Sequence, residues 1–206
     1  MNDIKVAINY ISSLSSAPDK RGAERGASLA LLRNMLDDNS AIIDRHPSGA
    51  PFLPGYPDKV ISISHSGDYI AISIGNSPQG IDIQIPSPKL NRVASRFISS
   101  DDAMPSSCSD PLLLLWTIKE AVYKAALTPG LPLHSIVILS IRQLSPAYSL
   151  CSTLHQGMSD FTGSVPKPDD SIEYWSSTIL TPSGRFTATS RLSRDITITL
   201  ATPSSD

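Results

Sequence analysis

Apolar residues follow two different periods along the chain, and the change of period separates predicted strands from predicted helices. Residues 59–64, 68–74 and 80–85 alternate between apolar and polar positions, which is typical of half-buried strands. The breaks between them are short enough for an antiparallel meander. Residues 4–11 predict an earlier strand, whereas residues 44–57 are too rich in Pro and Gly for regular structure. Later strands are expected over residues 135–141, 172–180, 185–189 and 196–201, with a hairpin turn at residues 182–184.

The most apolar predicted helix spans residues 112–127, LLLLWTIKEAVYKAAL. Asp110 stands where an N-cap is expected, and Pro111 suits the first helical position. Pro129 and Gly130 end the helix on the far side. Because almost every residue between these signals is apolar, we expect the helix to be buried around most of its circumference.

A second helix is predicted over residues 21–36, and a shorter one over residues 89–98. Lys20, Arg21 and Arg25 cluster at the start of the second helix. They form either a solvated basic end or the rim of a site for an anion. The sequence leaves both interpretations open.

The apolar helix carries a narrow polar stripe. Thr117, Glu120 and Lys124 are spaced three and four residues apart, so their side chains share one face. An exposed Glu–Lys pair at this spacing contributes only about 0.2–0.5 kcal/mol to helix stability. The apolar surroundings favour a second interpretation, in which the charges are buried and serve a site.

An acid in the third alternating strand is the matching feature. Asp82 and Gln84 share one strand face, opposite three isoleucines. Asp82 forms either a structural salt bridge or, with Glu120, a magnesium site, since Mg²⁺ prefers a few carboxylates, water and phosphate oxygens. Lys124 would then lie near the phosphates. His65, between the first two strands, either donates to a phosphate oxygen or is an ordinary turn residue.

Composition limits the function classes. At 206 residues the chain can bury a core, and its net charge of −2 shows no footprint for nucleic acid or an anionic membrane. The sequence has no apolar run of membrane-spanning length and no signal-peptide pattern, so a cytoplasmic soluble protein is expected. Cys108 and Cys151 lack metal-ligand spacing and are expected to be free thiols.

Five short elements, in order, resemble the 4′-phosphopantetheinyl transferase family. The family pattern is a G-x-P element, an SHS element, G-[IV]-D, an RF-x-S-x-x-E element and [FW]-x-x-K-E-[AS]-x-x-K. Here they are Gly49-x-Pro51, Ser64-His65-Ser66, Gly80-Ile81-Asp82, Arg96-Phe97-Ile98-Ser99 with Asp102, and Trp116-Thr117-Ile118-Lys119-Glu120-Ala121-Val122-Tyr123-Lys124. The length resembles the larger, surfactin-synthetase-activating branch, whose members are monomers with two similar halves.

The resemblance implies an activity and a set of roles. Such enzymes move the 4′-phosphopantetheine arm of coenzyme A (CoA) to a serine of an apo acyl or peptidyl carrier protein and release adenosine 3′,5′-bisphosphate. Asp82 and Glu120 would hold Mg²⁺ on the CoA diphosphate, and Glu120 would help to deprotonate the serine, directly or through water. Lys124 would offset charge on the phosphates, while Ser64 and His65 would bind phosphate oxygens. Phosphoryl transfer depends mainly on such positioning and charge neutralisation.

Two positions depart from the family pattern. Gln84 stands where the family often has a third acid, so we expect its amide oxygen to ligate Mg²⁺ or orient a water, with weaker metal binding. Ala50 stands where the family usually has Lys or Arg to meet the CoA 3′-phosphate. The residues that could replace the missing cation are Arg45, Lys20, Arg21 and Arg25.

The order strand, helix and strands occurs twice, around a junction near residues 104–110. We therefore predict an α+β fold of two similar halves, residues 1–104 and 105–206, each a small antiparallel sheet packed on a long helix. The predicted function is magnesium-dependent phosphopantetheinyl transfer. The alternative, favoured by Gln84 and Ala50, is a weak or inactive relative that binds CoA or a carrier protein.

Overall fold

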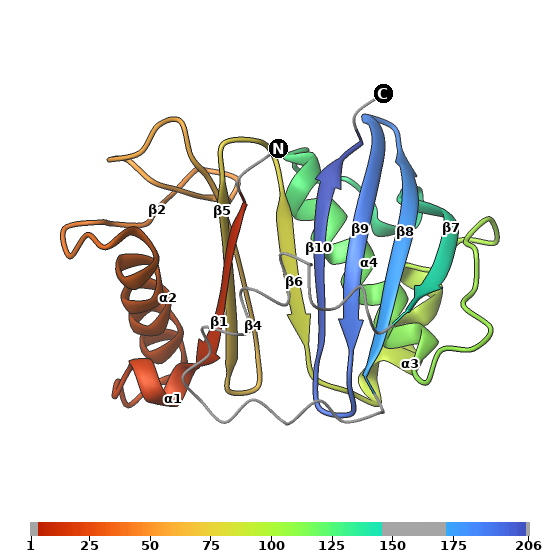
Figure 1. Cartoon of the computed structure of the whole chain (residues 1–206), viewed down its shortest axis with the longest axis horizontal. Coiled ribbons are helices and arrows are strands. Elements are labelled where there is room, and N and C mark those ends of the chain that lie inside the picture. The colour runs from red at the N-terminus through yellow and green to blue at the C-terminus, as the bar shows by residue number, and fades with distance from the viewer. Residues whose placement is uncertain (1–3, 146–171, 205–206) are drawn as a thin grey trace.

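The computed structural model describes residues 4–145 and 172–204, which form helices and antiparallel sheets (Figure 1). The predicted α+β class is confirmed. Of the two cysteines, Cys151 lies outside the described residues, and Cys108 is a half-buried free thiol. Burial raises the pKa of the Cys108 thiol to about 12, so it stays protonated at neutral pH. No helix in the described part of the chain is long and apolar enough to cross a membrane.

The N-terminal sheet has the order β1-β5-β4. Its strands are β1 (Lys5–Tyr10), β4 (Val60–Ser66) and β5 (Tyr69–Gly75). A short α1 (Ile11–Leu14) leads to α2 (Lys20–Leu36), which lies along the outer side of this sheet (Figure 1). The Asp19 side chain caps α2 by accepting a hydrogen bond from the Gly22 N–H at 2.8 Å.

The second sheet has the order β6-β10-β9-β8-β7. Its strands are β6 (Gly80–Gln84), β7 (Val137–Leu144), β8 (Glu173–Thr181), β9 (Gly184–Leu192) and β10 (Thr197–Pro203). Helix α4 (Pro111–Ala126) covers one face of this sheet (Figure 1). The predicted cap is confirmed, because Asp110 Oδ1 accepts from the Leu113 N–H at 3.1 Å.

Smaller elements connect the sheets. They are β2 (Asp44–Arg45), β3 (Pro51–Phe52), α3 (Lys89–Val93) and the 3₁₀ turns η1 (Ala94–Arg96) and η2 (Leu133–Ser135). The helix predicted over residues 89–98 is therefore shorter, with a 3₁₀ turn at its end. The segment expected to be irregular contains the two-residue strands β2 and β3, which pair with each other.

The predicted three-stranded meander is wrong in its third strand. Strands β4 and β5 pair as expected, but β6 pairs with β10, with Asp82 opposite Thr199. The physical reason is that β6 turns its isoleucines into an apolar cluster shared with Val6, Ile8 and Ile198, which includes residues from both sheets. The partner strand, β10, lies more than a hundred residues further along the chain, so no local sequence pattern predicts the pairing.

A row of serines joins the edges of the two sheets. Ser62 Oγ accepts from the Ile81 N–H at 3.0 Å, and Ser66 Oγ accepts from the Ile85 N–H at 3.1 Å. Hydroxyls of β4 thus replace the backbone ladder that a neighbouring strand would supply. The boundary predicted between residues 104 and 105 stays a prediction, as does the similarity of the halves.

Candidate active site

A buried carboxylate lies where the two sheets meet α4. Asp82, only 5% exposed, accepts hydrogen bonds at Oδ1 from Ser64 Oγ at 2.7 Å and from Lys124 Nζ at 2.8 Å. Lys124 also donates to the Ile81 carbonyl at 2.9 Å. Three predicted site residues, from β4, β6 and α4, therefore meet at one carboxylate oxygen.

Gly80 allows this meeting, because α4 passes directly over the start of β6. A Cβ at position 80 would lie 2.6 Å from the Ala125 backbone nitrogen and 2.9 Å from Lys124 Cβ, and would also collide with the Ala121 carbonyl oxygen. Only glycine permits so close an approach. The glycine of the G-I-D element thus sets the distance between Asp82 and the helix that carries Glu120 and Lys124.

Glu120 lies close enough to this cluster to interact with it electrostatically. Burial raises the pKa of Glu120 above its ordinary value, and the charge of Asp82 raises it further, while Lys124 lowers it. A carboxylate with a raised pKa beside a second acid is suited to accepting a proton. Of the polar stripe of α4, Lys124 contacts Asp82 directly. Thr117, at the other end of the stripe, accepts a hydrogen bond from Thr199 Oγ1 at 3.1 Å.

Lys119, the neighbour of Glu120, lies outside this cluster. Its side chain is fully buried, and its Nζ lies 2.6 Å from Asp102 Oδ2. Asp102 also accepts from the backbone N–H groups of Ser99 and Ile138, at 2.7 and 2.9 Å. Burial lowers the pKa of Lys119, and its hydrogen bond to Asp102 opposes that shift. The aspartate of the RF-x-S element therefore forms a closed ion pair with α4.

The chemistry of the Asp82 site fits a hard cation. Asp82 Oδ2 is buried and has no hydrogen-bond partner among the described residues. An unpaired buried carboxylate oxygen is costly, and a cation would satisfy it. Gln84 shares the strand face of Asp82, and its amide donates to the Ile85 carbonyl at 3.2 Å. No group of three or more His, Cys, Asp or Glu side chains that could hold a metal occurs in residues 4–145 and 172–204.

A cavity of about 600 Å³ lies between α2 and β4. Arg21, Arg25, Arg45 and His65 line it, together with the carboxylate of Glu24. The structure thus brings four of the six predicted basic residues to one cavity. Lys20 is 80% exposed, and its Nζ lies 3.7 Å from Glu24 Oε1.

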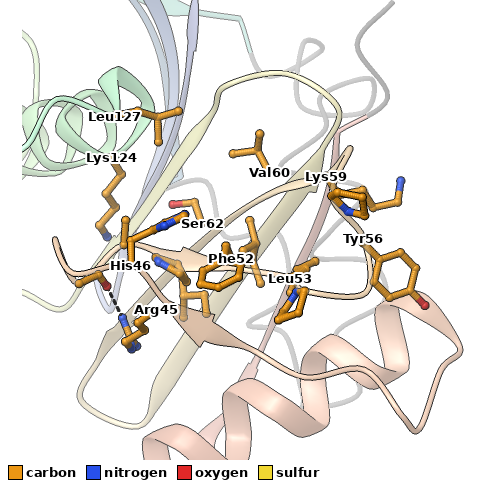
Figure 2. Close-up of a pocket in the computed structure, with 17 residues that line it drawn as sticks. Arg45, His46, Phe52, Leu53, Tyr56, Lys59, Val60, Ser62, Lys124 and Leu127 are labelled. Carbon is orange, nitrogen blue, oxygen red and sulfur yellow. Dashed lines mark hydrogen bonds between the residues drawn. The ribbon is translucent and has the colours of Figure 1, made fainter.

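A second cavity of about 600 Å³ connects Arg45 with Lys124 (Figure 2). Figure 2 shows Lys124 and Leu127 reaching from α4 toward a pocket walled by Phe52, Leu53 and Val60. The Arg45 guanidinium donates to the Gly49 carbonyl at 2.8 Å, which holds it beside Ala50. The two cavities share Arg45, so together they reach from the basic residues of α2 to Lys124.

Sequence reasoning missed Glu24, because an acid among the three cations at the start of a helix is expected to be an ordinary solvent-exposed residue. It also missed the serine row, although the alternation of serines at positions 62, 64 and 66 was a signal for it. The ion pair of Lys119 with Asp102 was not predicted either, because Lys119 lies off the polar stripe of α4 and Asp102 precedes that helix in the chain.

Comparison with known proteins finds two curated transferases that are similar to part of this chain. The chain is 34% identical over 84 residues to a 4′-phosphopantetheinyl transferase of Bacillus subtilis, a match that covers 38% of each chain. The resemblance to the 4′-phosphopantetheinyl transferases is confirmed. A 4′-phosphopantetheinyl transferase of Bacillus pumilus is 30% identical over 89 residues, which cover 40% of this chain and 38% of that protein.

The matches to these transferases are partial. The chain spans about two fifths of the length of the curated relatives it matches. No protein-family model matches the chain. Membership of the larger transferase branch therefore stays a prediction.

Proposed function

We propose that this protein transfers the 4′-phosphopantetheine arm of CoA to a serine hydroxyl of an apo acyl or peptidyl carrier protein, releasing adenosine 3′,5′-bisphosphate. The two relatives are named 4′-phosphopantetheinyl transferases, which supports the transfer of a phosphopantetheinyl group. The observation that carries the proposal is the cluster of Asp82, Lys124 and Ser64 with Glu120 beside it. This arrangement combines a metal-binding carboxylate, a cation for phosphate and a proton acceptor.

In the proposed reaction, the serine oxygen attacks the phosphorus that carries the pantetheine arm. The new serine–phosphorus bond forms as the bond from that phosphorus to the oxygen of the adenosine-bound phosphate breaks, and the electron pair leaves with the nucleotide. Glu120 accepts the serine proton, directly or through a water. Lys124 offsets the charge that develops on the phosphates.

Asp82 and Glu120, with the Gln84 amide oxygen, are the proposed ligands of Mg²⁺. The unpartnered Asp82 Oδ2 supports this assignment. Bound there, the ion would neutralise the charge of the diphosphate and polarise its oxygens. The cation Lys124 already compensates one oxygen of Asp82, so the metal would meet the other.

We propose that the cavity between α2 and β4, called the basic cavity from here on, binds phosphate groups of CoA. Arg21, Arg25, Arg45 and His65 line it, whereas the Ser64 hydroxyl is bound to Asp82. The Arg45 guanidinium donates to the carbonyl of Gly49, the neighbour of Ala50, so we propose that Arg45 replaces the missing cation. Lys20 is largely exposed, so we propose that it contributes less to phosphate binding, from the rim of the cavity.

A second candidate is a relative that binds CoA or a carrier protein without transfer. Gln84 and Ala50 favour it, because each removes a charge that the family pattern supplies. Titration calorimetry with CoA and chromatography of the nucleotide product separate the two. Binding with release of adenosine 3′,5′-bisphosphate in the presence of an apo carrier protein supports transfer, whereas binding without release supports the second candidate.

The proposal extends to the setting of the enzyme. We propose a cytoplasmic monomer with halves at residues 1–104 and 105–206, with the carrier protein and CoA as its partners and no nucleic acid or membrane. Sedimentation at working concentration tests the monomer. A concentration-dependent dimer would contradict it.

A further inference from the structure

The basic cavity contains one acid that the proposed reaction does not use. Glu24 lies on the second turn of α2, and its side chain is 15% exposed. Arg21 and Arg25 line the same cavity from α2, and Arg45 lines it from β2. A carboxylate at this place repels an incoming phosphate, so on charge alone it weakens the site.

Glu24 makes a specific contact inside the cavity. Its Oε1 lies 3.3 Å from Nδ1 of His65, within ion-pair distance. The second cation near it, Lys20, is 80% exposed and at 3.7 Å, so solvent screens that contact strongly. His65 is itself 44% exposed, which leaves part of its ring open to a ligand.

We propose that Glu24 is a positioning residue for His65, an inference that rests on the proposed binding of CoA phosphate in this cavity. The carboxylate directs Nδ1 toward α2 as a protonated nitrogen, and Nε2 is left for the ligand. With phosphate bound, the imidazolium lies between two anions, donating Nδ1–H to Glu24 and Nε2–H to a phosphate oxygen. The acid thus strengthens one donor to phosphate, although its own charge opposes the phosphate.

A double-mutant cycle tests this balance of effects. CoA affinity is measured by titration calorimetry, without carrier protein, for the wild type, Glu24→Gln, His65→Ala and the double variant. We expect Glu24→Gln to weaken CoA binding about tenfold, the size of one hydrogen bond to a charged group. In the His65→Ala background, the same change should leave binding unchanged or tighten it, because only the repulsion remains.

A matched control and a fold check accompany the cycle. Asp37→Asn removes an exposed acid at the opposite end of α2 and should leave CoA affinity unchanged. Circular dichroism and thermal melting identify a variant that fails to fold. The proposal is overturned if Glu24→Gln tightens CoA binding in the presence of His65, or weakens it equally with and without His65.

A second readout needs no ligand. The ¹⁵N chemical shifts of the His65 ring report which nitrogen carries the proton, and we expect a protonated Nδ1 in the wild type. A ring protonated at Nε2 alone overturns the positioning role. Absence of CoA binding in every variant, with a protonated Nδ1 intact, contradicts the proposed function instead and leaves the contact of Glu24 with His65 established.

Discussion

Single residues of this chain hold buried charge in two different ways. Asp102 and Lys119 form a closed pair, in which both Asp102 oxygens accept hydrogen bonds. Asp82 has one oxygen bound to Lys124 and Ser64, and the other buried without a partner among the described residues. Closed pairs of this kind serve the structure. The open oxygen of Asp82 is the feature expected of a site that takes a cation.

The residue beside Asp82 on β6 offers a test of metal affinity. Gln84→Glu restores a negative charge on the strand face of Asp82, so we expect tighter Mg²⁺ binding. A magnesium titration of the transfer rate should reach half-saturation at a lower concentration than in the wild type. Gln143→Glu, on an exposed position of β7, is the matched control. Equal half-saturation in the wild type and Gln84→Glu would contradict the assignment.

Glu120 makes stability depend on pH. Its pKa is raised in the folded protein, so between its ordinary and its raised pKa the folded state holds a proton that the unfolded state has released. Stability therefore falls as pH rises through this window, and the loss persists above it. Glu120→Gln should be more stable than the wild type at neutral pH and lose activity.

Denaturant unfolding at several pH values, with a chelator present, measures this difference. The advantage of Glu120→Gln should disappear below the ordinary glutamate pKa, where the carboxyl is neutral in both states. A Glu120→Gln protein that is less stable than the wild type at neutral pH would contradict the account.

Among the elements, the contact of α4 with β6 determines the geometry of the site. Gly80→Ala places a methyl group against the Ala125 nitrogen and Lys124 Cβ. Because backbone atoms cannot yield as side chains do, we expect a loss of about 1–3 kcal/mol in the free energy of unfolding. We also expect a large loss of transfer activity, since α4 must move away from Asp82.

Gly55→Ala is the matched control, because nothing lies within 4 Å of the added methyl group. Denaturant unfolding and the transfer rate are compared for both variants. If Gly80→Ala behaves as Gly55→Ala does, the close approach does not govern the site.

Local sequence signals predicted the helices and strands better than they predicted which strands pair with each other. The start of α4 follows from Asp110 and Pro111, and its buried face from the run of leucines. The pairing of β6 with β10 could not be predicted, because it depends on which strand edge remains free after the chain has folded. Within the site, motif spacing predicted Asp82, Glu120 and Lys124, but the contact of Glu24 with His65 depends on how α2 packs beside β4.

Across the whole molecule, the site lies at the junction of two sheets. The serines of β4 bind the backbone of β6, so they connect the N-terminal sheet to the five-stranded sheet. The same edge supplies Ser64 to Asp82. Stability of the junction and geometry of the site are therefore coupled.

Ser62→Ala tests that coupling. It leaves the buried Ile81 N–H without its partner at 3.0 Å, so we expect a loss of about 1–3 kcal/mol in unfolding free energy. Ser100→Ala, whose hydroxyl is exposed, should change stability little. Equal stability of the two variants by denaturant unfolding would show that the serine row does not hold the sheets together.

Intact-mass spectrometry tests the central claim most directly. An apo acyl carrier protein is incubated with this protein, CoA and Mg²⁺, and its mass should rise by about 340 Da, the mass of one phosphopantetheine arm. The gain should vanish with Asp82→Ala and with Glu120→Ala. An unchanged mass with several acyl and peptidyl carrier proteins, from a folded protein that binds CoA, would contradict the proposed transfer.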